Sequence, residues 1–173
     1  MNDVVFFNPL DRQLPIGLNL LEMRKGLTEE QQEDEKDIIA SSIISIFHKL
    51  YSEKYLGPRM ENILRFAILT VLETEQPTLF TLQKLLTDDK YRAKIVATLK
   101  DPVVKDFWLH EFKQFGSYQK AEAVSPITNK LGRFLSSPLC RNILGQYHTT
   151  IDFEQVMNEG KILLCNLPKG QVG

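Results

Sequence analysis

Cysteine is scarce in this sequence. Only Cys140 and Cys165 occur among the 173 residues, and neither belongs to a CxxC motif or has a histidine at ligand spacing. A zinc site is therefore unsupported, and unpaired thiols in a reducing cytoplasm are expected instead. The fold must depend on burial of apolar side chains, which a chain of this length with 43% hydrophobic residues can supply in one domain.

Long apolar runs and an excess of one charge are also missing. No run reaches the ~18 residues that a membrane span needs. The first residues, MNDVVFFNPLD, lack the basic and then apolar regions of a signal peptide. These absences predict a cytoplasmic protein. The 21 basic and 22 acidic residues give a net charge of −1, which indicates neither a nucleic-acid nor a membrane partner.

The even balance hides one acidic segment. Residues 28–37, TEEQQEDEKD, contain six acidic residues and one lysine, so the rest of the chain is mildly positive. The segment is either a docking face for a basic partner or the solvated first turn of a helix. Solvation is the commoner role of such charges.

Motifs for enzymatic chemistry are absent. The sequence has no GxxxxGK[ST], HExxH or GxSxG pattern, and His48, His110 and His148 are scattered without a partnered nucleophile. The final KGQVG has a Gly-x-x-Gly spacing, but no helix or Lys-Ser pair follows it, so a turn is favoured over a phosphate-binding loop. We therefore expect no catalytic, cofactor-binding or metal-binding residue in this chain, and neither binding nor hydrolysis of ATP.

Helical periodicity dominates the residues that are present. Thr28 and Gln31 form a capping-box pattern at the start of a helix that should extend to about Tyr55. Apolar residues from Met60 to Leu72 follow the helical spacing without a miss, which predicts the central helix of the fold. The apolar side of the first helix is predicted to be Ile39, Ile43, Ile46, Phe47 and Leu50.

Shorter helices complete a predicted bundle of about seven. Asp88 or Asp89 and then Asp101 are the expected N-caps of two of them. Pro126 is expected in the first turn of a helix that begins near Ser125. The aromatic residues of the segment 101–115 could stack on bases, but their helical spacing favours the core. The shorter helices are predicted at 78–88, 89–100, 101–115, 125–136 and 137–145, and the aromatic residues are Phe107, Trp108, Phe112 and Phe115.

Two short strands are predicted near the ends of the sequence. Residues 3–8 and 161–167 are apolar runs, and a short helix capped by Thr150 or Asp152 and ended by Gly160 precedes the second. Continuous apolar strands are typical of parallel sheets, and a two-stranded ribbon alone is marginally stable. We therefore expect the two strands to be parallel neighbours in a larger α/β protein from which this chain is excised. The helical block would then be an insertion between them.

Basic residues gather in the stretch SPITNKLGRFLSSPLCRNILGQ. Lys130 and Arg133 lie on the same side of the predicted helix. Asn129 is beside them, and Arg141 is one helix later. These four residues either contact nucleic acid or a neighbouring subunit, or they belong to the solvated side of the helices. The second interpretation is favoured, because helices routinely carry charges on their wet face.

Four ordered segments resemble one protein family. They are DVVFFNPLDRQLPIGLNLLE, GPRMENILRFAILTVLE, SPITNKLGRFLSSPLCRNILGQ and TTIDFEQVMNEGKILLCNLPKGQVG. Together they are similar to the middle of the type IV secretion and conjugation ATPases, a group that includes the HerA-like and TraG/TraD-like DNA-pumping motors. The resemblance covers nearly the whole chain and does not specify the subfamily.

The resemblance implies a mainly α fold. Residues 28–149 would be an all-helical domain inserted between two strands of a truncated RecA-like α/β motor domain. Residues 1–27 and 150–173 would be the flanking motor segments. Both Walker motifs of that family lie outside this sequence, so ATP and Mg are expected in the parent protein and not in this fragment.

The resemblance also implies a function and partners. The parent would be a homo-hexameric DNA-translocating ATPase, either free in the cytoplasm or at the inner face of the membrane. The helical domain would contact DNA, a relaxase-type cargo or a neighbouring subunit. The alternative is a self-contained helical adaptor that binds protein and has no motor. The reading frame on both sides of this chain discriminates between the two.

Overall fold

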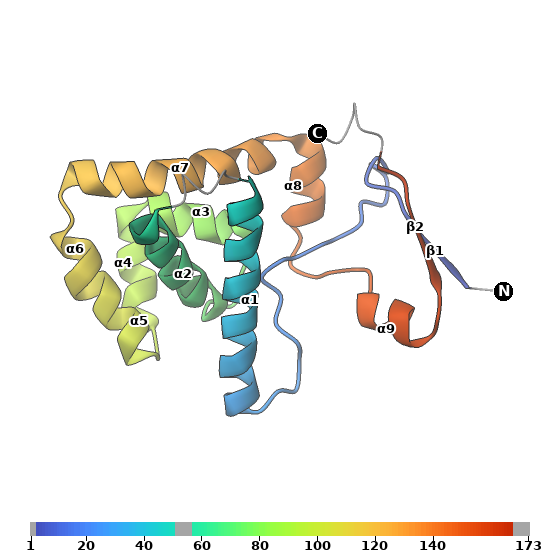
Figure 1. The fold of residues 1–173 in the computed structure, drawn as a ribbon, viewed down its shortest axis with the longest axis horizontal. Helices are drawn as coiled ribbons and strands as arrows, with labels where there is room; N and C mark the ends of the chain where they lie inside the picture. Colours follow the sequence, from blue (N-terminus) through green and yellow to red (C-terminus); the bar gives the residue numbers. More distant parts are fainter. Residues whose placement is uncertain (1–2, 51–56, 168–173) are drawn as a thin grey trace.

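The protein has two parts in the computed structural model, which describes residues 3–50 and 57–167. Figure 1 shows a helical body (residues 29–144) on one side and a sheet region (residues 4–7 and 153–165) on the other, joined by two chain segments. The predicted end of the first helix near Tyr55 and the KGQVG segment lie outside the described residues.

The mainly α fold class is confirmed. α7 extends along one side of the helical body, and α8 lies at the end nearer the sheet region (Figure 1). No helix in the two described ranges is long and apolar enough to cross a membrane. The helical body contains α1 (Glu29–Leu50), α2 (Pro58–Leu72), α3 (Leu79–Thr87), α4 (Asp89–Thr98), α5 (Pro102–Asp106), a π-helical turn (Phe107–Glu111), α6 (Phe112–Gln114), α7 (Ser117–Ser136) and α8 (Pro138–Leu144), and the sheet region contains β1 (Val4–Phe7), α9 (Phe153–Asn158) and β2 (Ile162–Cys165).

α2 is the central helix, as its periodicity predicts. Ile63, Leu64, Ala67 and Ile68 have no exposed surface. α1, α3 and α7 all contact α2. Because apolar residues on more than one side of α2 are covered, this helix contributes the middle of the hydrophobic core.

The buried side of α1 differs partly from the predicted one. Ile43 and Phe47 are buried as predicted, and Ala40 and Ile44 are buried with them. These four residues keep the helical i, i+3, i+4, i+7 spacing. Isoleucines occur around much of this helix, so side-chain size alone does not identify the packed face. The predicted residues that remain partly or largely exposed are Ile39, Ile46 and Leu50.

The acidic segment at the start of α1 is only partly solvated. Glu35 is 8% exposed, and its Oε1 accepts hydrogen bonds from the backbone N and the Nε of Arg24, at 3.2 and 3.0 Å. A buried carboxylate needs such a cationic partner. One member of the segment therefore has a structural role, whereas Glu29, Glu30 and Glu33 stay exposed.

The predicted helix starts are mostly confirmed. Gln31 N donates to Thr28 Oγ1 at 3.3 Å, and Thr28 N donates to Gln31 Oε1 at 3.0 Å, which makes the capping box reciprocal. Asp152, rather than Thr150, caps α9 through Gln155 N. The other side-chain N-caps at predicted positions are Asp88 of α4, Asp101 of α5 and Ser137 of α8.

The helix predicted over residues 101–115 is interrupted by the π-helical turn. Trp108 lies in this turn, and its Nε1 donates to the buried Oγ1 of Thr70 at 2.7 Å. Val103, in the first turn of α5, is 66% exposed. The aromatic side chains that are buried in the core are Phe107, Trp108 and Phe112.

The predicted start of the next helix is wrong. α7 begins at Ser117 rather than near Ser125, so Pro126 lies inside the helix. An internal proline removes one helical hydrogen bond and costs ~3 kcal/mol in an isolated helix. Tertiary packing offsets this cost, because α7 buries a continuous stripe against α2 and α3. The stripe consists of Ala123, Ile127, Leu131 and Leu135.

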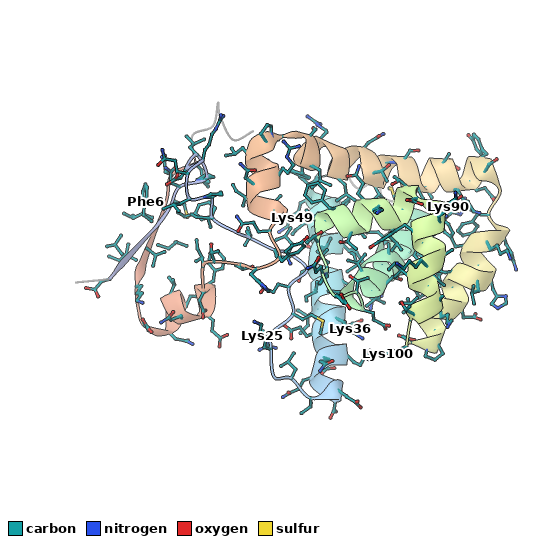
Figure 2. The ribbon with its side chains drawn as sticks, turned by 180° about the vertical axis from the view of Figure 1, so that it is seen from behind. Phe6, Lys25, Lys36, Lys49, Lys90 and Lys100 are labelled. Carbon is teal, nitrogen blue, oxygen red and sulfur yellow. The ribbon has the colours of Figure 1, made fainter. Side chains whose placement is uncertain are left out.

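The two strands are parallel neighbours, as predicted. β1 pairs with β2 in the register Val4↔Ile162 to Phe7↔Cys165. Within this chain, the two strands are not covered on both faces. One face is open, because its four apolar side chains are about half exposed: Val4 53%, Phe6 59%, Ile162 56% and Leu164 49%. Figure 2 shows Phe6 pointing away from the helical body.

Candidate contact surfaces

The predicted contact residues occupy two helices. Asn129 and Arg133 are exposed on α7, on the side opposite its buried stripe. Lys130 is half-buried at the edge of that stripe. Arg141 is exposed on α8, beyond the turn at Ser137. The outer side of α7 and the surface of α8 are therefore two separate candidate surfaces.

Arg133 and Arg141 differ from most other arginines of the described ranges. No carboxylate among the described residues lies within ion-pair distance of either guanidinium. By contrast, Arg24 pairs with Glu35, Arg65 with Asp37, and Arg92 with Asp89. An exposed, unpaired guanidinium can form charge-assisted, bidentate bonds to a phosphate or a carboxylate.

Arg141 lies at a hollow that none of the other three candidates lines. This surface, called the Arg141 hollow, has a volume of about 810 Å³ and includes Leu14, Ile16 and Phe80. Leu14 is 79% exposed and Phe80 is 40% exposed. Among the described residues, Arg141 is the only charged one in its lining. The remaining lining residues are Gln13, Pro15, Asn142, Gly145, Gln146 and Thr150.

One wall of the Arg141 hollow belongs to a hydrogen-bonded junction between residues 15–22 and 143–150. Gln146 Nε2 donates to the carbonyl oxygens of Pro15 at 3.0 Å and Asn142 at 2.8 Å. The backbones also approach closely, because a Cβ at Gly17 would lie 2.3 Å from the carbonyl oxygen of His148. The junction therefore fixes the two segments that connect the helical body to the sheet region.

Asn19 is the most buried polar residue of the junction, at 6% exposure. Its Nδ2 donates to the carbonyl oxygens of Pro77 and Tyr147, both at 2.9 Å, and its Oδ1 accepts from Leu21 N at 3.0 Å. The Asn19 side chain thus connects residues 19–21, the α2–α3 loop and the segment after α8.

Glu22 closes the other end of the junction. Its carboxylate accepts from Thr149 N at 2.6 Å and lies 2.9 Å from His148 Nδ1. Partial burial of the Glu22 carboxyl opposes its ionisation, but the hydrogen bonds from Thr149 and His148 outweigh that effect and lower its pKa. No local pattern indicates Asn19 or Glu22, because Asn19 donates to carbonyls 58 and 128 positions away and Glu22 accepts from a backbone N–H 127 positions away.

Comparisons with protein-family models, curated proteins and solved structures found no match to this chain. The features of this chain that bear on its function are therefore the strand pairing, the exposed arginines and the Arg141 hollow.

Proposed function

We propose that residues 28–149 are the helical domain of a ring-forming P-loop ATPase that translocates DNA, of the conjugation or type IV secretion type. In this proposal the domain is inserted into a RecA-like motor and contacts DNA, a relaxase-type cargo or a neighbouring subunit. ATP and Mg would be bound by parts of the parent other than this segment.

The observation that carries the proposal is the parallel pairing of β1 with β2. Parallel neighbours need a crossover connection, which is usually a single helix. Here the connection is the whole segment 8–161, which contains the helical body. A domain inserted into a crossover of a larger parallel sheet accounts for this arrangement.

The open face of the sheet supports the same proposal. Its half-exposed apolar side chains are of the kind that parallel sheets bury beneath helices. Two strands of four residues each are also marginal as an independent sheet. Further strands and covering helices of a motor domain would complete the sheet region.

A second candidate is the self-contained helical adaptor. The observation in its favour is that the main core extends only from Leu21 to Leu135, with no residue of either strand. A helical body with its own core could bind partners without a motor. Under this alternative, the pairing of β1 with β2 would only hold the two ends of the chain together, and no larger sheet would extend it.

The reading frame on both sides of this chain tests the proposal. The motor requires GxxxxGK[ST] upstream and an apolar strand ending in Asp-Glu downstream. Protein containing these flanks should hydrolyse ATP faster when DNA is added. Absence of both motifs would reject the motor and leave the adaptor.

The DNA-contact role has its own test in that longer protein. Replacing Lys130 and Arg133 by Glu should weaken the stimulation of ATPase by DNA, and raising the salt concentration should weaken it further, because phosphate contacts release counterions. Unchanged stimulation at two salt concentrations would assign both residues to the solvated side of α7.

A further inference from the structure

We propose that the Arg141 hollow docks a short segment of a partner protein, in which an apolar side chain lies next to an aspartate or glutamate. The inference deepens the partner-contact role proposed above for the helical domain, and it rests on that role rather than on ATP hydrolysis. The partner class follows from the apolar surface of the hollow, its single charge and its fixed geometry.

The apolar part of the hollow is formed by Leu14, Ile16 and Phe80. Leu14 is the most exposed large hydrophobic residue in the described part of the chain, at 79%, and Phe80 is 40% exposed. Burial of such side chains against a partner removes apolar surface from water. The hollow therefore suits an aliphatic or aromatic anchor.

The polar part of the hollow determines which residue of the partner is favoured next to its apolar anchor. Arg141 is the only charged residue that the described ranges contribute to the lining, and no carboxylate in those ranges pairs with it. A guanidinium presents its N–H donors in a planar fork that matches a carboxylate. A partner carboxylate beside the anchor would thus be held by Arg141 while the anchor contacts Leu14 and Phe80.

The hollow is fixed before a partner arrives. Gln146 joins the Pro15 and Asn142 carbonyls, and Leu18 N donates to the Ile143 carbonyl at 2.9 Å. The ring of Phe80 packs so closely on Gly145 that a Cβ there would lie 2.6 Å from Phe80 Cε2. A preformed wall reduces the ordering cost of binding.

A nucleic-acid strand fits the same surface less well. A strand needs several cations along its path, whereas the described residues contribute one cation, Arg141, to this lining. Phe80 also lines a second hollow, in which Lys94 is accompanied by Glu73 and Glu75. The two carboxylates offset this one cation, so the second hollow does not extend a cationic path for phosphates.

The test uses residues 1–173 and a panel of fluorescein-labelled ten-residue peptides. The peptides place Leu, Ile, Phe or Trp between Asp and Glu residues, and a matched panel carries Asn and Gln in place of the acids. We expect saturable fluorescence polarisation for the acidic panel, with a dissociation constant on the order of 100 µM. The neutral panel should bind at least about tenfold more weakly, because the carboxylate partner of Arg141 is lost.

Two matched pairs of variants locate the binding. Arg141→Glu and Leu14→Ser should each weaken binding about tenfold or more. Their controls are Lys90→Glu, an exposed cation on α4 (Figure 2), and Met157→Ser, a 73% exposed apolar residue on α9, and both should bind like the unchanged protein. All four side chains are exposed, and a thermal melt confirms that each variant is folded.

Three outcomes would overturn the inference. The first is no binding of any acidic peptide at 1 mM. The second is binding that neither Arg141→Glu nor Leu14→Ser reduces. The third is an alternative occupant: Arg141-dependent binding of oligo-dT, or Arg141-dependent self-association in sedimentation, without peptide binding. Each of these leaves the motor proposal intact, because that proposal is decided by the flanking motifs and by ATPase activity.

Discussion

The helical body and the sheet region bury their apolar side chains to very different extents. In α2, Ile63, Leu64 and Ile68 have no exposed surface, whereas Phe6 of β1 and Ile162 of β2 are 59% and 56% exposed. The helical body has the closed core of an independent folding unit. The sheet region has the apolar side chains of a buried sheet, but they are half exposed here, and the hydrogen-bonded junction connects this region to the helical body.

The largest expected change in stability is for a substitution in α2, which tests whether this central helix stabilises the helical body. Ile68→Ala should lower the free energy of unfolding by about 2–5 kcal/mol, because it removes fully buried methyl groups and leaves a cavity. Chemical denaturation monitored by circular dichroism measures the change.

The matched control is Ile38→Ala on α1. This isoleucine is 61% exposed, so the same chemical change should alter stability by less than about 0.5 kcal/mol. Equal effects of the two substitutions would mean that α2 is not the centre of the core.

A smaller effect is expected at the junction between the two regions. Asn19→Ala leaves the carbonyls of Pro77 and Tyr147 without their donor and should cost about 1–3 kcal/mol. Hydrogen exchange should also accelerate in residues 143–150 more than in α2. Asn129→Ala, an exposed amide on α7, is the control and should change neither quantity. A loss of protection in α2 equal to that in the junction would show that the two regions unfold as one unit.

Much of the helical body was predictable from local patterns. The spacing from Met60 to Leu72 marks α2, and Thr28 with Gln31 marks the start of α1. The parallel pairing of the strands was also predictable. A single short strand is not stable alone, and the two apolar runs are the only strands predicted in the sequence, so each is the expected hydrogen-bonding partner of the other. These features depend on neighbouring residues or on a simple count of strands.

The errors come from features that depend on distant residues. The start of α7 was misplaced because Pro126 is a strong local signal, and packing against α2 and α3 overrides it. The Arg141 hollow and the junction bring residues 13–22 beside residues 141–150. No periodicity or capping motif encodes such a contact, so the sequence indicates Arg141 as a candidate contact residue but not the residues around it.

The pH dependence of stability gives a smaller test of the junction. The folded-state pKa of Glu22 is lowered, so its ionised form stabilises the fold above the ordinary value of 4.5. This contribution should be lost as the pH falls below 4.5 through the lowered pKa. Melting temperatures of the unchanged protein and Glu22→Gln should therefore converge in acid and separate toward neutral pH. Glu111→Gln, which removes an exposed carboxylate on the helical body, should show no such separation.

The smallest expected effect in this chain is at the open face of the sheet. Phe6→Ala should change the stability of residues 1–173 by less than about 0.5 kcal/mol, since the ring is 59% exposed and points away from the helical body (Figure 2). In the longer protein, a covering motor domain would bury this ring, and the same substitution should then cost about 3–5 kcal/mol. Ile68→Ala is the internal control, because the core of the helical body is the same in both lengths and its cost should not change. If Phe6→Ala is nearly neutral in both lengths, the sheet face stays open and the inserted-domain proposal loses its structural support.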